Sequence, residues 1–489
     1  ALPIWGSLPE GTIALFLIQI FSTLSYSVLY STLVLFLTSK LGLTVKLANS
    51  ITGVFVATNF ALHLLGGYFG GRFLSNRFLF CMGMVAQIIG CILLAGMSVN
   101  LLYYGLASFL TGCGLNVTCI NYMLTQRFTP KDNRRETAFL WNYAGMNIGF
   151  FVGFSLSGYF QLSQNYQSLF LFSSLGNLAA LFICLYFWHD LADQNTAYSR
   201  LQKDSQRKAS LWGVALMLCL PLALNQLLHF ASLANKLILF TGSWMLTIVI
   251  WLAFQQKTQE AREKMFAFTV LMLVSTVFWT LYTIGPMGLT TFITHNVDRN
   301  WLMLTIPPQW FNNINTLCIV LGGPALSLFL RRLRSRGIKV NIPAQFAYAL
   351  LLIGLAFAIL PLGIARADNS GMVASGWVIF SFILQSVGEL LISPIGYAMV
   401  GALIPGSLQG IMMGMWMLGS GVGATIASYS SNTMIAGQDT ISPLLTNNGY
   451  SRVFLNLSLF ALAASFVLFV LTPKLRAWIN EDRQDLVEE

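Results

Sequence analysis

A single carboxylate stands inside an otherwise uncharged apolar segment in the C-terminal part of the sequence. The segment LQSVGELLISPIGYAMV spans residues 384–400, and its only charged residue is Glu389. Placing a charge at the centre of a bilayer costs about 2.5–3.5 kcal/mol on insertion scales. Because charges inside membrane segments commonly mark substrate or proton pathways, Glu389 is the first candidate functional residue.

Three roles for Glu389 are open. It can bind the ammonium group of a substrate, carry a proton that exchanges with substrate, or serve as a protonated structural residue bonded to a neighbouring helix. None of the other acidic residues, seventeen in all with Glu389, lies deep in an apolar segment. His63, in NFALHLLGG, is a second candidate for proton transfer, although a histidine at this place can also simply pack between helices.

The composition is that of an integral membrane protein. The chain has 489 residues, of which 56% are hydrophobic and only 9% are charged, whereas soluble domains carry about 25% charged residues. Apolar runs of helical length recur along the whole sequence, so we expect helices and not the strands of a barrel. The sequence predicts fourteen spans, over residues 12–38, 47–71, 78–98, 100–123, 137–160, 166–188, 210–231, 236–255, 265–289, 309–330, 342–364, 374–403, 410–430 and 452–472.

The basic residues give the orientation of these spans. With both termini in the cytoplasm, most of the 27 Lys and Arg residues fall in cytoplasmic loops, and none falls inside a span beyond its first residue. An excess of Lys and Arg in cytoplasmic loops is the usual rule for membrane proteins. We therefore predict a multi-pass membrane protein with cytoplasmic N- and C-termini, and we do not attribute the net charge of +10 to nucleic-acid binding.

The spans divide into two groups of six. Residues 1–188 form a first six-helix bundle, residues 189–264 form a cytoplasmic connector with two inserted helices, and residues 265–489 form a second six-helix bundle and tail. Two six-helix halves are the layout of major facilitator transporters, which bind substrate between the halves. The basic part of the connector is either a solvated linker or a site for a lipid or protein partner.

The sequence contains no recognisable motif that is typical of an enzyme. The seven cysteines lie mostly within apolar segments without CxxC spacing, which is typical of packed, reduced thiols. No metal-ligand cluster, phosphate-binding glycine loop or catalytic triad is recognisable. We expect neither an enzyme nor a pump driven by nucleotide hydrolysis, and no metal or other cofactor.

Several segments resemble the proton-coupled oligopeptide transporter (POT) family of the major facilitator superfamily. They include RETAFLWNYAGMNIGFFVGFSLSGYF (135–160), IPPQWFNNINTLCIVLGGP (306–324), GELLISPIGYAMVGALIPGSLQGIMMGMWMLGSGVG (388–423) and GGYFGGRFLSNR (66–77). The resemblance covers nearly the whole chain and implies an all-α major facilitator fold. Because two inserted spans are typical of bacterial members, it also implies a protein of the bacterial inner membrane, and it suggests a monomer. It also implies substrate-binding roles, which fall on Glu389, Asn147, Asn315, Trp310 and Trp416.

The chain departs from the family pattern where that pattern is charged. The first helix of the family reads ExxERFxYYG with a further arginine after it, and these charges fall on Gln19, Ser22, Thr23 and Tyr30. The other family charges fall on Val117 in the fourth helix, Thr283 in the seventh, Gly71 in the loop after the second, and Gln409. Charges that pair in the family are therefore lost together, and replacing both partners of a buried pair can be nearly neutral.

These losses lead to a hypothesis on selectivity. Asn147, Asn315, Tyr26 and Tyr30 can donate hydrogen bonds to a substrate carboxylate but cannot neutralise its charge. Zwitterionic di- and tripeptides should then bind poorly, and amines with a masked or absent carboxylate should bind better. Restoring the cations with Val117→Lys and Thr23→Arg should improve dipeptide uptake. Trp310 and Trp416 are predicted to wall the pocket, although packing alone explains them equally well.

The function predicted from the sequence is secondary active transport by alternating access. The substrates are small peptides or peptide-like amine-bearing solutes, and proton coupling runs through Glu389, with His63 as a second candidate. Two alternatives stay open. One is transport of a non-peptide metabolite such as a siderophore or an amine compound, and the other is a receptor that does not transport.

Overall fold

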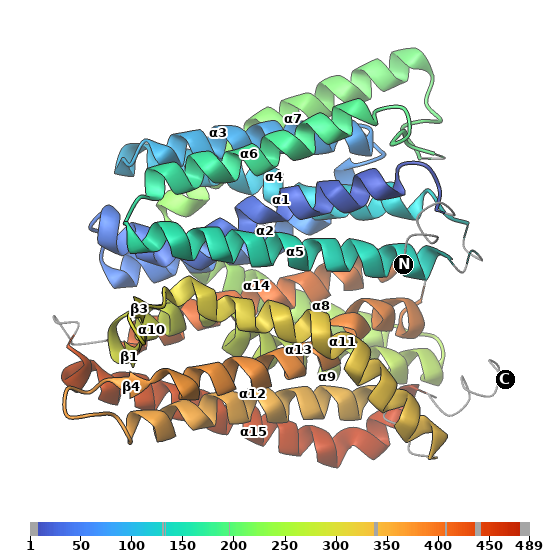
Figure 1. Ribbon diagram of the computed structural model, residues 1–489. Helices are drawn as coiled ribbons and strands as arrows, with labels where there is room; N and C mark the ends of the chain where they lie inside the picture. The colour runs from blue at the N-terminus through green and yellow to red at the C-terminus, as the bar shows by residue number, and fades with distance from the viewer. Residues whose placement is uncertain are drawn as a thin grey trace. The chain divides into compact units, whose positions relative to one another are not determined.

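The structure is a computed structural model, and its polypeptide forms two compact units, residues 1–234 (unit 1) and 235–489 (unit 2). It describes residues 8–129, 132, 134–194, 196–336, 341–405, 408–435 and 442–479. Figure 1 shows that long helices make up most of the described chain.

Unit 1 is a bundle of antiparallel helices (Figure 1). α1 continues into a π-helical turn, η2, and packs against α5 and α6, while α3 packs against α4 and α6, and α7 packs against α4. The elements are α1 (Thr12–Leu35), η2 (Phe36–Lys40), α2 (Val45–Phe69), α3 (Asn76–Ala95), α4 (Val99–Thr125), α5 (Arg134–Leu162), α6 (Tyr166–Tyr186) and α7 (Lys203–His229).

Local sequence explains several features of this bundle. Thr44 and Ser75 cap α2 and α3, because their hydroxyl oxygens accept hydrogen bonds from the backbone N–H groups of Leu47 and Phe78. Glycine allows α3 and α4 to approach closely, since a Cβ atom at Gly90 would lie 2.7 Å from the backbone nitrogen of Phe109.

Unit 2 is a second helical bundle with short strands at one end (Figure 1). β1 pairs with β4 in parallel, and β2 pairs with β3 as an antiparallel hairpin. The elements are α8 (Ala231–Phe254), α9 (Gln259–Tyr282), η3 (Gly285–Leu289), α10 (Thr290–Asn296), β1 (Val297–Asp298), β2 (Asn300–Trp301), β3 (Leu304–Thr305), η4 (Pro308–Phe311), α11 (Asn312–Ser335), α12 (Ile342–Ile364), β4 (Val373–Ala374), α13 (Ser375–Leu403), α14 (Gln409–Met434) and α15 (Pro443–Ile479).

The helix that begins as α9 is interrupted before it continues as α10. Pro286 lies in the π-helical turn η3, and Met287 has non-helical dihedral angles of φ −117° and ψ −105°. Proline cannot donate a backbone hydrogen bond and displaces the preceding turn, so it accounts for the break.

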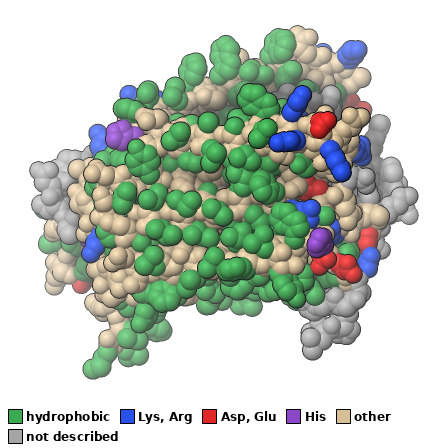
Figure 2. Space-filling model, turned by 90° about the horizontal axis from the view of Figure 1, so that it is seen from above, with side chains coloured by type: hydrophobic (Ala, Val, Ile, Leu, Met, Phe, Trp, Pro, Cys, Tyr) green, Lys and Arg blue, Asp and Glu red, His purple; other side chains and the backbone are tan. Residues whose placement is uncertain are grey.

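The predicted spans are confirmed, because each of the fourteen coincides with a long helix in the described residues. Ten helices among these residues are long and apolar enough to cross a membrane. The helix ends differ from the predictions, and α7 begins at Lys203 instead of residue 210. Hydropathy marks only the apolar part of a helix, whereas the backbone hydrogen bonds continue into its polar ends. Figure 2 shows the resulting band of hydrophobic side chains, with charged side chains gathered toward its ends.

The inserted helices each pack on a different unit. In unit 1, a Cβ atom at Gly213 of α7 would lie 2.6 Å from the Leu74 side chain. In unit 2, Val249 and Ala253 of α8 are fully buried in the hydrophobic core. The packing of the described residues therefore divides the chain once, between 234 and 235. The predicted boundaries at 188 and 264 stay predictions about functional organisation.

Candidate functional site

The carboxylate of Glu389 lies in unit 2 among side chains from α9, α11 and α13. Asn315 Nδ2 on α11 donates a hydrogen bond of 2.8 Å to Glu389 Oε2 and lies 3.0 Å from the Ser386 hydroxyl. The Tyr282 hydroxyl on α9 donates a further hydrogen bond to the carboxylate. Among the described residues, both partners of Glu389 are thus neutral. No Lys or Arg in the described part of the chain forms an ion pair with this carboxylate.

Two members of this cluster were not predicted from the sequence. Ser386 precedes Glu389 by three residues on α13, so helical periodicity alone would have placed both on one face. Tyr282 lies at the end of α9, far away in sequence, and no local pattern marks it. The pairing of Asn315 with Glu389 brings together two residues that the family resemblance had singled out separately.

The two predicted pocket tryptophans lie in different environments within unit 2. Trp416 is only 4% exposed, and its ring lies 6.2 Å from that of Phe346 in the hydrophobic core. Trp310 lies in η4 and is 39% exposed. The surroundings of Trp416 favour packing, while Trp310 remains accessible. A substrate-contacting role for either residue stays a prediction.

In unit 1, a neutral hydrogen-bonded network replaces the charges that the family pattern places on the first helix. Gln19 Nε2 donates to Thr23 Oγ1 over 2.9 Å, and Asn142 Nδ2 on α5 donates to Gln19 Oε1 over 3.3 Å. The Ser22 hydroxyl donates to the backbone oxygen of Gln19 over 3.3 Å. All four side chains are buried. These substitutions are consistent with one another, because the amide and hydroxyl groups bond to each other without an ion.

Tyr26 and Tyr30 form an aromatic cluster in unit 1. Their ring centroids lie 6.0 Å apart, and the Tyr26 ring also stacks on Phe55 of α2 at 6.2 Å. A side-chain hydrogen bond links Tyr26 to Asn59 of α2. Cys113 Sγ on α4 donates to Asn59 Oδ1 over 3.2 Å. Both tyrosines are partly accessible, and their role as substrate ligands stays a prediction.

Asn147 and His63 are also placed in unit 1. Asn147 is 5% exposed, and its Nδ2 donates to the backbone oxygen of Tyr143 over 3.0 Å within α5. His63 is partly exposed, its ring lies edge-on to Phe60 at 6.0 Å, and its Nε2 has no hydrogen-bond partner among the described residues. The substrate role of Asn147 and the proton-transfer role of His63 stay predictions.

The connector that follows α6 folds onto the loop between α2 and α3. Asp193 Oδ2 accepts a hydrogen bond of 3.0 Å from the backbone nitrogen of Asn76, and Oδ1 accepts one of 3.2 Å from Asn76 Nδ2. Burial raises the pKa of the Asp193 carboxyl above its ordinary value, while the bonds from Asn76 oppose that rise. A carboxylate from the connector therefore caps the first turn of α3.

The same connector explains the glycine at position 71. Gly71 has a φ of +74°, in the left-handed region that favours glycine. A Cβ atom there would lie 3.1 Å from Thr196 Cγ2 of the connector. The family pattern places an aspartate at Gly71, and in this chain the connector fills that space and Asp193 brings a carboxylate to the same loop.

The described residues contain no group of three or more His, Cys, Asp or Glu side chains that could hold a metal ion. The arrangement offers instead one carboxylate in unit 2 and uncharged hydrogen-bonding and aromatic groups in unit 1. Such groups are suited to reversible binding of a polar solute.

Comparison with known proteins places this arrangement in a family. A family model described as PTR2, POT family, matches residues 77–449. Dipeptide and tripeptide permease A of Erwinia pyrifoliae is 28% identical over 481 residues, which cover 97% of this chain and 96% of the relative. The permease of the same name from Escherichia coli is 27% identical over 479 residues, with 98% and 95% coverage.

Solved structures show the same fold. The crystal structure of a mutant peptide transporter POT in complex with alafosfalin superposes with a TM-score of 0.84, at 22% identity and 96% coverage of both chains. That of a POT family transporter in complex with 5-aminolevulinic acid gives a TM-score of 0.82, at 21% identity, covering 96% of this chain and 99% of the other. The major facilitator fold is thereby confirmed. Since the family model spans well over half of the sequence, the chain belongs to the POT family and is a multi-pass membrane protein.

Proposed function

We propose that this protein is a secondary active transporter that moves small peptides or peptide-like amine-bearing solutes across the bacterial inner membrane by alternating access. Relatives named dipeptide and tripeptide permease support the substrate class. The family is one of transporters, and the protein is not an enzyme. The observation that carries the proposal is the Glu389 carboxylate, held by Asn315 and Tyr282, which offers a negative charge for a substrate ammonium group.

The neutral network of unit 1 supports a preference among such substrates. The carboxylate of a zwitterionic peptide loses its water when the peptide binds. Without a cation nearby, the cost of burying that charge weakens the binding. The positions from which the family pattern supplies cations are occupied by Thr23 and Val117. Uncharged donors in unit 1, such as the Tyr26 and Tyr30 hydroxyls, suit a substrate that carries an amide, ester or hydroxyl in place of the carboxylate. The preferred substrates are therefore amines whose carboxylate is masked or absent.

Glu389 also serves as the proton carrier in this proposal. A carboxylate that binds the substrate amine in its charged form releases it on protonation, which couples substrate release to proton movement. His63 is a second candidate for proton transfer. The transporter works as a monomer, and it needs protons and the lipid bilayer but no nucleic acid.

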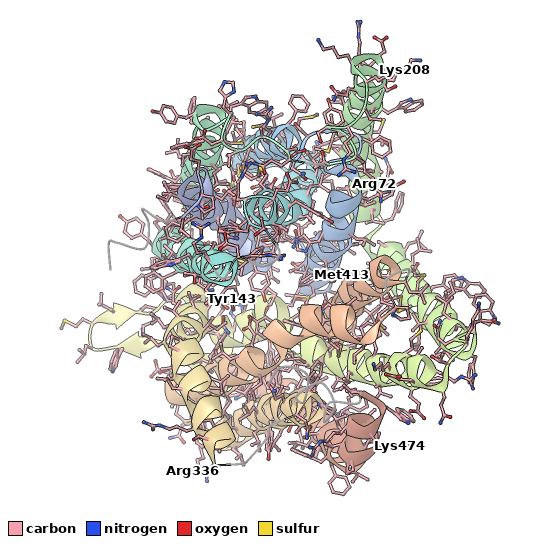
Figure 3. All side chains as sticks on the ribbon, turned by 90° about the vertical axis from the view of Figure 1, so that its right-hand side faces the viewer. Arg72, Tyr143, Lys208, Arg336, Met413 and Lys474 are labelled. Atoms are coloured by element: carbon pink, nitrogen blue, oxygen red, sulfur yellow. The ribbon has the colours of Figure 1, made fainter. Side chains whose placement is uncertain are left out.

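The proposed orientation places both termini in the cytoplasm. Basic residues support this at the helix ends of each unit: Arg72 and Lys208 in unit 1, and Arg336 and Lys474 in unit 2 (Figure 3). Arg72 follows α2 and Lys208 lies near the start of α7, and backbone contact between residues 71 and 198 brings these two ends together. Lys and Arg concentrate on the cytoplasmic side of membrane proteins.

A transporter of a non-peptide amine is the second candidate. The uncharged character of Gln19, Thr23 and Val117 favours it, because a substrate without a carboxylate needs none of the missing cations. Siderophores and simple amines with polar but uncharged ends belong to this class.

The decisive experiment compares substrates in proteoliposomes of known orientation. Uptake of alanyl-alanine is measured against alanyl-alanine amide and a simple alkyl amine of similar size. We expect at least about tenfold faster uptake of the amide, which corresponds to about 1.4 kcal/mol. The triple variant Gln19→Glu, Thr23→Arg, Val117→Lys should reverse the preference. Faster uptake of the free dipeptide than of the amide by the natural chain would contradict the proposed selectivity. If the triple variant took up the free dipeptide no faster than the natural chain does, the missing cations would not be the cause of that selectivity.

Two further measurements separate the alternatives. Substrate counterflow without a proton gradient tests transport itself, and its absence with bound substrate would indicate a receptor. An uncoupler then tests proton drive, since coupled uptake loses accumulation while counterflow continues. A siderophore or amine that exchanges better than every peptide would support the second candidate.

A further inference from the structure

The hairpin formed by β2 and β3 has an unusual turn. Asn300 pairs with Thr305 and Trp301 pairs with Leu304, which leaves Leu302 and Met303 as the turn residues. Leu302 has a φ of +56°, a conformation that glycine and asparagine adopt far more readily than leucine. The geometry of the turn therefore does not explain why leucine stands at position 302. A contact between its side chain and something outside the protein would explain it.

The tip of this hairpin is almost wholly accessible and carries no charge. Trp301 is 73% exposed, Leu302 is 94% exposed, Met303 is 101% exposed and Leu304 is 74% exposed. Four consecutive large apolar residues at such exposure are an interaction surface and not part of a core. We call residues 301–304 the hairpin tip.

The base of the hairpin is held firmly. Arg299 Nη1 donates to the backbone oxygen of Ile306 over 2.8 Å, and Nη2 donates to that of Thr294 over 3.2 Å. The Thr305 hydroxyl donates to Asn300 Oδ1 over 2.7 Å across the strands. The charged and polar groups therefore lie at the base, where they fix the direction in which the apolar tip points.

The hairpin lies at the end of the helices and points sideways. It follows α10 at the end of unit 2 opposite Arg336 and Lys474, and Figure 3 shows it projecting beyond α11, perpendicular to the helix axes. The helix that precedes the hairpin is long and apolar enough to cross a bilayer, and the ends of such a helix lie near the bilayer interface. The tip projects away from the bundle of unit 2 at that end.

α11, which follows the hairpin in the sequence, also carries an exposed apolar stripe. Along this helix Leu317, Leu321 and Leu328 are 47%, 70% and 61% exposed. In a membrane protein such a stripe suits contact with acyl chains.

We propose that the hairpin tip inserts into the interfacial layer of the leaflet at this end of the molecule and anchors unit 2 to phospholipid. Tryptophan is enriched at the membrane–water interface, because its ring is apolar and its indole N–H can bond to the headgroups. Leu302, Met303 and Leu304 bury their side chains among the upper acyl carbons. The absence of charge from the tip fits insertion, and the Arg299 side chain stays with the backbone carbonyls it binds.

The test measures the depth of a nitroxide label at the tip in phosphatidylethanolamine–phosphatidylglycerol vesicles (3:1). Met303→Cys is labelled in a background where Cys219 and Cys318 are replaced by serine and alanine, because these are the accessible or partly accessible native thiols among the described residues. Asn369→Cys, in the exposed loop between α12 and β4, is the matched control. The tip label should collide more with oxygen than with a water-soluble nickel chelate, by at least about threefold relative to the control.

Three outcomes are distinguishable. Equal nickel accessibility of the two labels would mean that the tip lies in water and would overturn the proposal. Spin–spin broadening that disappears when labelled protein is diluted with unlabelled protein would assign the tip to a second copy and would also overturn it. Oxygen accessibility without broadening supports the lipid anchor.

A second measurement avoids the cysteine background. The Trp301 contribution is obtained as the difference in fluorescence between the natural chain and Trp301→Phe, whose hairpin keeps the same backbone. Lipids brominated near the headgroup should quench this difference more than lipids brominated deep in the acyl chain. Absence of quenching by either lipid would contradict insertion.

Discussion

The two units of this protein treat buried polarity in opposite ways. In unit 2, the carboxylate of Glu389 is retained and is held by the neutral groups of Asn315 and Tyr282. In unit 1, the positions expected to be charged form the neutral network of Gln19, Thr23 and Asn142. A buried ion pair can be replaced as a pair at little cost, whereas a stranded partner is strongly destabilising. The neutral residues of unit 1 therefore form a matched set. Unit 2 also lacks a charge that the family pattern places at Thr283, but it keeps the Glu389 charge that the proposed function needs.

Among the variants that test this difference between the units, a single charge introduced into unit 1 should have the largest effect, and the effect should be on stability. Thr23→Arg buries a cation beside Gln19 and Asn142 without an acid, and we expect a loss of about 3–5 kcal/mol in the free energy of unfolding. The double variant Gln19→Glu, Thr23→Arg should recover most of that loss. Unfolding by SDS titration in mixed micelles measures both. If Thr23→Arg were as stable as the natural chain, the neutral network would accept a cation without a matching acid, which would contradict this prediction.

Removing the charge of unit 2 should chiefly affect binding. Glu389→Gln keeps the size of the side chain and an oxygen that accepts from Asn315, but it removes the attraction for an ammonium group. We expect uptake of the amide substrate to fall by about 30- to 100-fold, a loss of about 2–3 kcal/mol.

The matched control for this variant is Glu260→Gln, at the exposed start of α9, where the carboxylate forms a surface salt bridge of 2.8 Å with Lys264. Its uptake should stay near that of the natural chain, since surface pairs contribute little. If both variants lost the same amount of uptake, Glu389 would have no specific role in substrate binding.

The hydrogen bonds that position Glu389 should matter less than its charge. Tyr282→Phe removes one donor to the carboxylate and leaves the ring in place, so we expect about a three- to tenfold weaker affinity for the amide substrate. The maximal uptake rate should change less than the half-saturation concentration. Tyr30→Phe in unit 1 is the comparison, and a larger loss there would shift the centre of recognition away from unit 2.

The smallest effect should come from the connector carboxyl in unit 1. Burial raises the pKa of Asp193, so the folded state takes up a proton more readily than the unfolded chain. Stability should therefore be highest below the ordinary aspartate pKa and should fall as pH rises through the interval up to the raised value. Relative to Asp193→Asn, we expect the melting temperature of the natural chain to fall by about 1–2 °C across that interval. The opposite slope would contradict the assignment.

Much of the fold could be predicted because membrane spans have a strong local signal. The interior of a bilayer requires long apolar segments, so hydropathy located every long helix in the described chain, while the short α10 lies beyond the predicted span 265–289 and was not predicted. The helix ends could not be predicted as well, because Lys203 and its neighbours extend α7 without being apolar. Glu389 was recognisable for the same physical reason, since an unpaired charge in a span is costly and rare.

The order of residues was enough to predict the membrane class, the succession of helices, the single acid inside a span at Glu389 and the absence of charge from the first helix. Which side chains contact one another became known from the packing of the helices. It joined Tyr282 and Asn315 to the carboxylate and brought Asp193 to Asn76 across more than a hundred residues of chain. It also directed the hairpin tip outward. Apolar length is a local property that each segment carries alone, whereas a hydrogen bond between distant helices depends on packing, which no single segment records.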